Sequence, residues 1–148
     1  MEVKELGHIV LYVRDLERSR HFYRDVLGWN EATELGGFGA MFSSGRTHHE
    51  LLLIEVGPDA TPIPKGRRVG MYHFGLKVGT TDDELREAFE TLQREGVPIV
   101  GTADHHVTHS LYIMDPDGNE IELYIDVQPE RWREDPSVIA GAPKPLRL

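Results

Sequence analysis

The chain has 148 residues, of which 39% are hydrophobic, so it can build the core of one ordinary domain and is not a disordered chain. Its formal net charge of −9 disfavours nucleic-acid binding, and the absence of cysteine excludes disulfides and leaves only nitrogen and oxygen ligands for a metal. No apolar run approaches membrane-spanning length and the first residues show no signal pattern, so a cytoplasmic protein without a membrane partner is expected.

The predicted elements follow one order twice along the chain. In the first half the order is a strand, a helix and three strands, at residues 6–13, 16–27, 31–35, 39–42 and 50–56. In the second half the same order is predicted at residues 71–78, 82–95, 98–102, 110–114 and 120–127. This internal duplication predicts an α+β fold of two tandem βαβββ modules within residues 1–127, with module 1 at about 1–57 and module 2 at about 70–127.

Both predicted helices have local start and stop signals. In the second helix, Thr81 and Glu84 are spaced as a capping box, and Gly96 suits the left-handed position just past the helix end. In the first helix, Asp15 is the expected cap and Gly28 the expected end. These signals predict where each helix begins and ends without reference to the rest of the fold.

Two segments outside the modules are rich in proline. Residues 57–70 contain three prolines and three glycines, which predicts a linker between the modules. The C-terminal tail, 128–148, also contains apolar side chains, namely Trp132, Val138, Ile139 and Leu146. These predict that the tail lies against the surface of the protein or a partner subunit, and a loosely docked tail is the alternative.

Strand geometry singles out His8, His73 and Glu122. Alternate side chains of a strand point to opposite faces, and each of these three residues lies opposite an apolar set on its own predicted strand. Those sets are Ile9, Leu11 and Val13; Phe74, Leu76 and Val78; and Ile121, Leu123, Ile125 and Val127. Because the apolar faces must pack against the helices, His8, His73 and Glu122 are expected on the other side of the sheet.

Two histidines and one carboxylate make up the facial triad that binds Fe(II) in non-haem enzymes, with open positions left for substrate and oxygen. Fe(II) is therefore the expected metal, with Mn(II), Ni(II), Zn(II) and Co(II) as alternatives, because metal availability also governs occupancy. The opposing interpretation is that both histidines are structural and that Glu122 faces solvent, as is expected for Glu120. The equivalent positions of His8 and His73 in the two modules favour the metal site.

The two ends of the duplicated region resemble a known superfamily. Residues 7–13, 15–16 and 22–28 (GHIVLYV, DL and FYRDVLG) resemble the start of a vicinal oxygen chelate module, and residues 115–124 (DPDGNEIELY) resemble the end of one. The resemblance covers the chain to about Val127 and implies paired βαβββ units that form a curved mixed sheet around a metal. The superfamily includes dioxygenases, glyoxalases, epimerases, fosfomycin-modifying enzymes and metal-free drug-binding proteins, so the resemblance alone does not define the reaction.

Within the superfamily, the chain looks most similar to type I extradiol (catechol 2,3-) dioxygenases, which cleave a catechol ring beside its two hydroxyls. His8, His73 and Glu122 match the iron ligands of that family. His49 matches its acid–base histidine, and Tyr112 matches a tyrosine that contacts the bound catecholate. The implied partners are a small aromatic diol and O2. The well-studied members carry two paired-module domains, whereas this chain has room for one.

One further catalytic position is implied by the same resemblance. His105 matches a second histidine of the dioxygenase site outside the metal ligands, although His106 and His109 lie close to it in the sequence. A neutral histidine can take up or return a proton near neutral pH, since its unperturbed pKa is about 6.5. His49 is the expected proton carrier.

Glu50 is the basis of an alternative function. When Glu50 is paired with Glu122 across the duplication, it lies on the metal side together with His48 and becomes a fourth ligand. Two histidines and two glutamates resemble the glyoxalase I site, where the metal of a lyase or isomerase polarises a hemithioacetal. The dioxygenase alignment instead turns His49 inward, which a bulge near the start of the strand would allow.

A third interpretation is a metal-free ligand-binding or resistance module, against which the complete set of three ligands argues. The exposed sheet edges of such folds often pair with a second copy, so a homodimer is expected.

Overall fold

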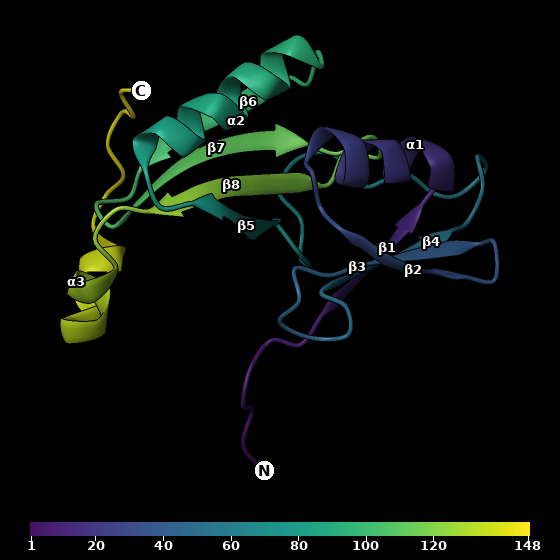
Figure 1. Ribbon diagram of the computed structural model, residues 1–148, viewed down its shortest axis with the longest axis horizontal. Coiled ribbons are helices and arrows are strands. Elements are labelled where there is room, and N and C mark those ends of the chain that lie inside the picture. The colour runs from purple at the N-terminus through teal and green to yellow at the C-terminus, as the bar shows by residue number, and fades with distance from the viewer. The chain divides into compact units, whose positions relative to one another are not determined.

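The computed structural model describes all 148 residues as two compact units, Met1–Ile63 and Pro64–Leu148. Each unit contains one four-stranded mixed sheet with helices (Figure 1), which confirms the predicted α+β fold of two tandem modules. The boundary between the units falls inside the linker predicted at residues 57–70. None of the helices is both long enough and apolar enough to cross a membrane.

Unit 1 forms a sheet with the strand order β1-β4-β3-β2, in which β1 and β4 are parallel and the other pairs are antiparallel. Its elements are β1 (Ile9–Val13), α1 (Leu16–Arg20), a π-helical segment η1 (His21–Val26), β2 (Glu31–Leu35), β3 (Gly39–Phe42) and β4 (Leu51–Glu55). The core lies between the sheet and the helix, where the buried side chains include Leu11, Val13, Phe22, Tyr23, Phe42, Leu51 and Leu53.

The helix of unit 1 begins and ends where the sequence predicts. Asp15 caps it, since its side chain accepts a hydrogen bond of 2.9 Å from the Arg18 amide. The helix widens in its second half, where the Leu27 amide bonds to the Phe22 carbonyl at 3.0 Å, five residues back. Gly28, with φ of +70°, then takes the left-handed conformation that glycine tolerates best.

Unit 2 repeats the arrangement with the strand order β5-β8-β7-β6, in which β5 and β8 are the parallel pair. Its module consists of β5 (His73–Gly79), α2 (Asp82–Arg94), β6 (Ile99–Asp104), β7 (Thr108–Met114) and β8 (Glu120–Asp126). The predicted capping box is present, with Thr81 accepting from the Glu84 amide and Glu84 from the Thr81 amide. α2 covers one face of the sheet (Figure 1), and Leu85 and Leu92 of this helix are buried.

The strand alternation predicted for β8 is confirmed, because Ile121, Leu123 and Ile125 are buried while Glu120 and Glu122 are only partly covered. The alternation predicted for the whole of β5 is wrong at its end. The register of β5 against β8 slips between Lys77 and Gly79, so Val78 lies in a bulge and is 37% exposed instead of joining the apolar face.

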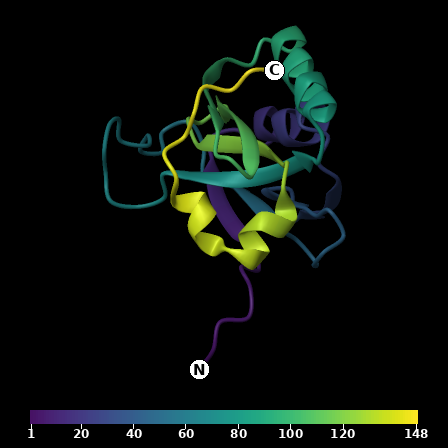
Figure 2. The same cartoon turned by 90° about the vertical axis from the view of Figure 1, so that its left-hand side faces the viewer.

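The C-terminal tail is docked on unit 2. It contains α3 (Pro129–Glu134) and a 3-10 segment η2 (Pro136–Ala140), coloured yellow in Figure 2. Beyond them, Lys144 and Asp104 exchange two backbone hydrogen bonds of 2.8 and 2.9 Å at the end of β6. The His106 ring adds a bond of 3.0 Å to the Ala142 carbonyl. The tail therefore lies on the protein's own surface at this point, as one of the two sequence interpretations proposed.

The absence of a side chain at Gly39 allows β3 to pack closely against its neighbours. A Cβ atom at this position would lie 2.8 Å from the Leu53 carbonyl oxygen and 3.3 Å from the Leu35 Cβ, whereas a Cβ at Gly7 would meet nothing within 4 Å. We expect Gly39→Ala to lower the free energy of unfolding by about 1–3 kcal/mol, because the backbone must shift to admit the methyl group. Urea unfolding of Gly39→Ala and of the control Gly7→Ala measures this, and equal midpoints for the two variants would contradict it.

Candidate functional site

Three adjacent strands of unit 2, β5, β8 and β7, bring His73, Glu122 and Tyr112 to one face of the sheet. Tyr112 of β7 is directly opposite Glu122 of β8 in the antiparallel ladder. On the other side of β8, Gly75 pairs with Glu122 and His73 pairs with Glu120. Because the apolar residues of β8 are buried on the α2 side, these polar side chains lie on the opposite face.

Three hydrogen bonds and one ion-pair contact join these side chains into a group that we call the Glu122 cluster: His73, His105, Ser110, Tyr112 and Glu122. Ser110 donates to Glu122 Oε1 at 2.6 Å, and the Tyr112 hydroxyl donates to the same oxygen at 3.2 Å. His105 Nε2 lies 2.8 Å from the Tyr112 oxygen, and His73 Nε2 lies 3.4 Å from Glu122 Oε2. One carboxylate oxygen is therefore held by two hydroxyls, and the other faces an imidazole.

Tyr112 remains a proton donor over the whole physiological range. Burial raises the pKa of its phenol to about 12, and the negative charge of Glu122 beside it acts in the same direction. A neutral phenol of this kind can donate a hydrogen bond to an anionic oxygen, either that of Glu122 or that of a bound molecule.

His73 and Glu122 suit a divalent cation as two of its ligands. Their facing atoms are 3.4 Å apart, a separation compatible with two ligands that each lie about 2.0–2.2 Å from one ion. Imidazole nitrogen and carboxylate oxygen are also the donor types that such cations accept in a chain without cysteine. Neither unit by itself holds a group of three or more His, Asp or Glu side chains placed around one ion, so further ligands have to come from outside this pair.

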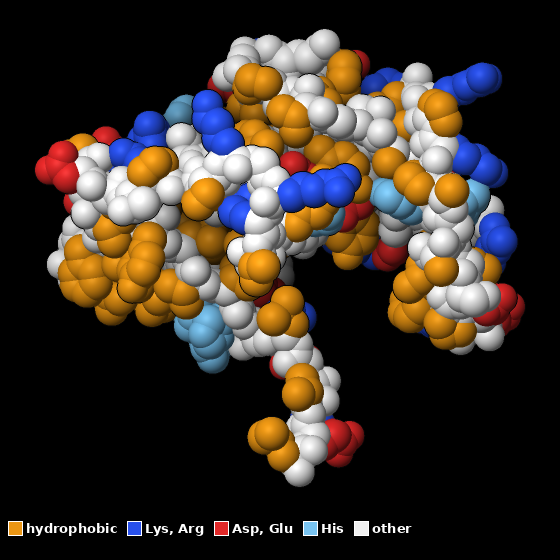
Figure 3. Space-filling view, turned by 180° about the vertical axis from the view of Figure 1, so that it is seen from behind, with side chains coloured by type: hydrophobic (Ala, Val, Ile, Leu, Met, Phe, Trp, Pro, Cys, Tyr) orange, Lys and Arg blue, Asp and Glu red, His pale blue; other side chains and the backbone are white.

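In unit 1, three histidine rings lie together just before β1 and β4. The His8 ring centroid is 4.4 Å from that of His49 and 6.0 Å from that of His48, and the Nδ1 atoms of His48 and His49 are 2.5 Å apart. Histidine side chains are visible on the molecular surface in Figure 3, and His8 is among the exposed ones. Burial lowers the pKa of His49, and the neighbouring His48 and His8 lower it further, so this imidazole favours its neutral form.

The sequence left open whether His48 or His49 faces the site, and β4 begins at Leu51. Both histidines precede the strand, so alternation does not decide which of them points to a given face. The structure places the ring of His49 nearer than that of His48 to the His8 ring.

The register also corrects the pairing of Glu50 with Glu122. Ile9 pairs with Leu51 in unit 1 as Phe74 pairs with Ile121 in unit 2, so Leu52 is the equivalent of Glu122, and Glu50 is the equivalent of Glu120. The Glu50 carboxylate is also engaged elsewhere. It accepts hydrogen bonds of 2.6 Å each from the amide and the hydroxyl of Ser44, and Arg46 lies 3.5 Å away.

Two members of this region were not found from the sequence. Ser110 is fully buried and bonded to Glu122, and Glu120 lies 3.5 Å from His73 Nδ1 although it was expected to face solvent. A signal for both was present, because each lies two residues from a predicted site residue on its own strand and so shares its face.

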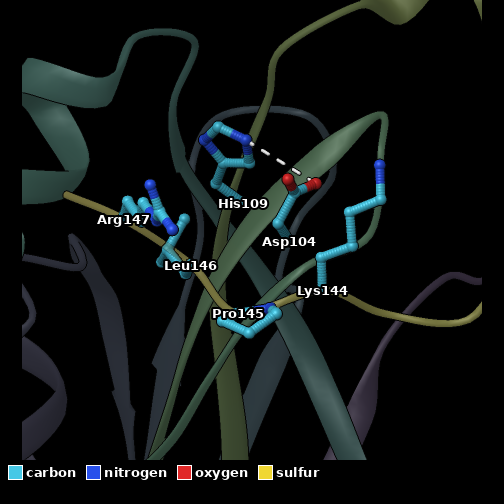
Figure 4. Close-up of a pocket in the computed structure, with 6 residues that line it drawn as sticks. All are labelled: Asp104, His109, Lys144, Pro145, Leu146 and Arg147. Atoms are coloured by element: carbon cyan, nitrogen blue, oxygen red, sulfur yellow. Dashed lines mark ion pairs between the residues drawn. The ribbon is translucent and has the colours of Figure 1, made fainter.

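The three histidines of the β6–β7 region, His105, His106 and His109, have different contacts. His105 contacts Tyr112, His106 points to the tail, and His109 lies 2.6 Å from Asp82 at the start of α2. His109 also lines a cavity of about 390 Å³ (Figure 4), whose other lining residues are Asp104, Lys144, Pro145, Leu146 and Arg147. This cavity belongs to the docked tail and contains no member of the Glu122 cluster.

The contacts of Glu50 predict a pH-dependent contribution to stability. Burial raises the pKa of its carboxyl, but the hydrogen bonds from Ser44 and the charge of Arg46 outweigh burial and hold the pKa below its ordinary value of 4.5. A carboxyl with a lowered folded-state pKa binds more protons when unfolded, so its contribution is present above the unfolded-state pKa and is lost as the pH falls through the folded-state pKa.

We therefore expect Glu50→Gln to lower the urea midpoint at about pH 7 and to have little effect at about pH 3, where the wild-type carboxyl is also protonated. The control is Glu87→Gln on the exposed side of α2, which should change the midpoint little at either pH. A cost of Glu50→Gln that is the same at both pH values would contradict the assignment.

Known proteins of related sequence carry out more than one type of reaction. The chain is 34% identical over 134 residues to a catechol-2,3-dioxygenase of Bacillus subtilis, which covers 90% of this chain and 46% of the relative, so the chain spans about half the length of that protein. It is 30% identical over 127 residues to a probable lactoylglutathione lyase of Synechocystis, covering 80% of this chain and 92% of the relative.

The fold is shared with solved structures. A glyoxalase/dioxygenase from Nostoc punctiforme superposes with a TM-score of 0.69 at 23% identity, over 83% of this chain and 91% of that protein. The sequence model of the glyoxalase/bleomycin resistance protein/dioxygenase superfamily matches residues 5–123, which cover most of both modules. Together with the duplicated βαβββ fold, this match shows that the chain belongs to the glyoxalase/bleomycin resistance protein/dioxygenase (vicinal oxygen chelate) superfamily.

Proposed function

We propose that this chain is a metal-dependent extradiol dioxygenase, which cleaves a catechol-type aromatic ring beside its two hydroxyls with O2. The observation that carries the proposal is the Glu122 cluster, in which His73, Tyr112 and His105 lie around one carboxylate. The similarity to a catechol-2,3-dioxygenase over most of this chain supports the same reaction class.

The proposed metal ligands are His8, His73 and Glu122, and the proposed metal is Fe(II). His73 and Glu122 face each other at a separation that suits two ligands of one ion. His8 is the proposed third ligand because the register gives it in module 1 the position that His73 has in module 2. When bound, the ion would supply Lewis-acid polarisation of the two diol hydroxyls and a redox centre for O2.

The remaining residues have roles that follow from their protonation and contacts. Tyr112 is a neutral donor that would hold a substrate oxygen, and His105, bonded to the Tyr112 hydroxyl, would keep that hydroxyl in place. His49 favours its neutral form and would accept a proton from the diol and return it later in the reaction. Positioning and proton transfer are thus assigned to side chains that are not metal ligands.

A lyase of the glyoxalase I type is the second candidate, because the probable lactoylglutathione lyase is also similar to this chain. A site with two histidines and two glutamates would need a module 1 carboxylate at the place that Glu122 has in module 2. The equivalent residue is Leu52, and the nearby Glu50 is bonded to Ser44. The register therefore favours the three-ligand dioxygenase site.

The activity is tested by loading the protein with Fe(II) under anaerobic conditions, adding catechol or 2,3-dihydroxybiphenyl and then admitting air. We expect a yellow ring-cleavage product whose formation matches oxygen uptake, because extradiol cleavage inserts both oxygen atoms of O2 into the product. The hemithioacetal of methylglyoxal and glutathione is assayed in parallel. Its conversion without oxygen uptake, together with no reaction of either diol, would replace the dioxygenase by the lyase.

The division of roles is tested with two variants. His73→Ala should lose stoichiometric metal binding, because one of three ligands is removed. His49→Ala should keep its metal content and lose about 10²–10⁴-fold in turnover, because only proton transfer is impaired. Metal analysis and steady-state rates measure both effects. Normal turnover by His49→Ala would show that the proton role is assigned to the wrong residue.

A further inference from the structure

We propose that Glu120 is a positioning residue that holds His73 in the tautomer and orientation required of a metal ligand. The inference rests on the proposed function, since it assigns His73 to a metal, and it extends that function to a residue outside the ligand set. It concerns unit 2 alone, where the residues involved lie on β5 and the adjacent strand β8.

The His73 ring lies between two carboxylates. His73 is opposite Glu120 in the parallel ladder, and Glu122, two residues further along β8, shares the same face. The ring presents one nitrogen to each of them, with Nδ1 at 3.5 Å from Glu120 Oε1 and Nε2 at 3.4 Å from Glu122 Oε2. The absence of a side chain at Gly75 leaves this place open, since a Cβ there would lie 3.3 Å from the Tyr124 ring and 3.8 Å from Glu122 Oε2.

The two nitrogens of the ring have different surroundings. Nδ1 is buried without a hydrogen-bond partner, whereas the His73 side chain as a whole is 27% exposed. A buried polar atom without a partner is costly, and a carboxylate 3.5 Å away can remove that cost by a small side-chain movement. The Nδ1–H tautomer then donates to Glu120, and the lone pair of Nε2 points toward Glu122, where the proposed metal binds.

The opposite tautomer is unfavourable for the same reason. With the proton on Nε2, that nitrogen would face Glu122 as a donor and could not bind a metal, while Nδ1, the buried nitrogen, would be an acceptor facing the acceptor oxygen of Glu120 with no donor to offset its burial. Metal-binding histidines commonly donate their second ring N–H to a carboxylate, which fixes the ring and raises its basicity. Glu120 faces Nδ1 and can accept its proton in this way. Glu122 cannot, because it faces Nε2, the nitrogen that would bind the metal.

In module 1, Glu50 is the residue equivalent to Glu120. Glu50 directly precedes β4 as His8 directly precedes β1, so by the register these two residues are the equivalents of the paired Glu120 and His73. Its carboxylate is held by Ser44 and faces Arg46, so it is occupied by other donors. The two modules thus have a glutamate at equivalent positions. Only Glu120 lies against its histidine, because the Glu50 carboxylate is bonded to Ser44 instead.

The test uses the full chain with Glu120→Leu, which removes the acceptor, and Glu120→Gln, which keeps a neutral one. Glu50→Gln is the matched control. Zinc affinity is measured by competition with a chelator, and we expect a loss of about 10–100-fold for Glu120→Leu, a smaller loss for Glu120→Gln and none for the control. The Gln variant also keeps the test valid if Glu120→Leu does not fold.

The second readout needs no metal and no activity. Long-range proton–nitrogen NMR spectra of the metal-free protein report which ring nitrogen of His73 carries the proton, with the resonances assigned from His73→Ala. We expect the Nδ1–H tautomer in the wild type and in Glu50→Gln, and a shift toward the Nε2–H tautomer in Glu120→Leu. An unchanged tautomer in Glu120→Leu, with zinc affinity equal to that of the wild type, would overturn the role of Glu120.

The two readouts separate this inference from the proposed function. If wild-type and His73→Ala protein bind zinc equally, the metal site is wrong, and the tautomer still decides whether Glu120 orients His73. If His73→Ala loses zinc while Glu120→Leu retains both affinity and tautomer, the metal site stands and the positioning role of Glu120 is refuted.

Discussion

Burial of Ile121, Leu123 and Ile125 against α2 determines the direction of every polar side chain on β8. These three residues are at most 2% exposed, and the two-residue period of a strand sends Glu120 and Glu122 to the opposite face. A shift of the register by one residue would expose all three apolar side chains, at a cost of roughly 1.5–3 kcal/mol each, and would bury the carboxylates of Glu120, Glu122 and Asp126. The core of unit 2 therefore fixes the position of the candidate site before any polar contact forms.

The polar contacts then make Glu122 a rigid acceptor. Its side chain is 18% exposed, so its negative charge is partly removed from water and depends on nearby donors. Ser110 and Tyr112 supply two hydroxyl donors to one oxygen, which leaves Oε2 directed toward His73. A carboxylate restrained in this way loses little conformational freedom when a cation binds, which is the general advantage of a preorganised ligand. The proposed metal site and the proposed role of Glu120 both draw on this arrangement.

The two modules show how one scaffold can carry different chemistry. Both have the strand order with the first and fourth strands parallel, and the register gives His8 and Glu50 of module 1 the positions that His73 and Glu120 have in module 2. They differ at the next outward-facing position of the fourth strand, which is Leu52 in module 1 and Glu122 in module 2. The proposed carboxylate ligand is therefore present in one module only, and this asymmetry favours a proposed site of three protein ligands over one of four.

Local signals in the sequence were sufficient for much of the fold. The duplication, the capping box at Thr81 and the end of the first helix at Gly28 depend on residues close together in the chain, and all are present in the structure. Strand parity also placed Glu122 correctly opposite the apolar face of β8. In these cases backbone geometry and side-chain chemistry act within a few residues, so the sequence contains the whole cause.

The contacts between strands could not be obtained in this way. The bulge at Val78, the start of β4 at Leu51 and the equivalence of Glu50 with Glu120 depend on the register between strands that are distant in sequence. The hydrogen bond of Ser110 and the neighbour of His73 Nδ1 depend on the same register. The sequence by itself determined the duplicated fold and the residue types of the candidate site. The tertiary structure decided which of those residues touch, because register is set by packing of the whole sheet against its helix and not by any one strand.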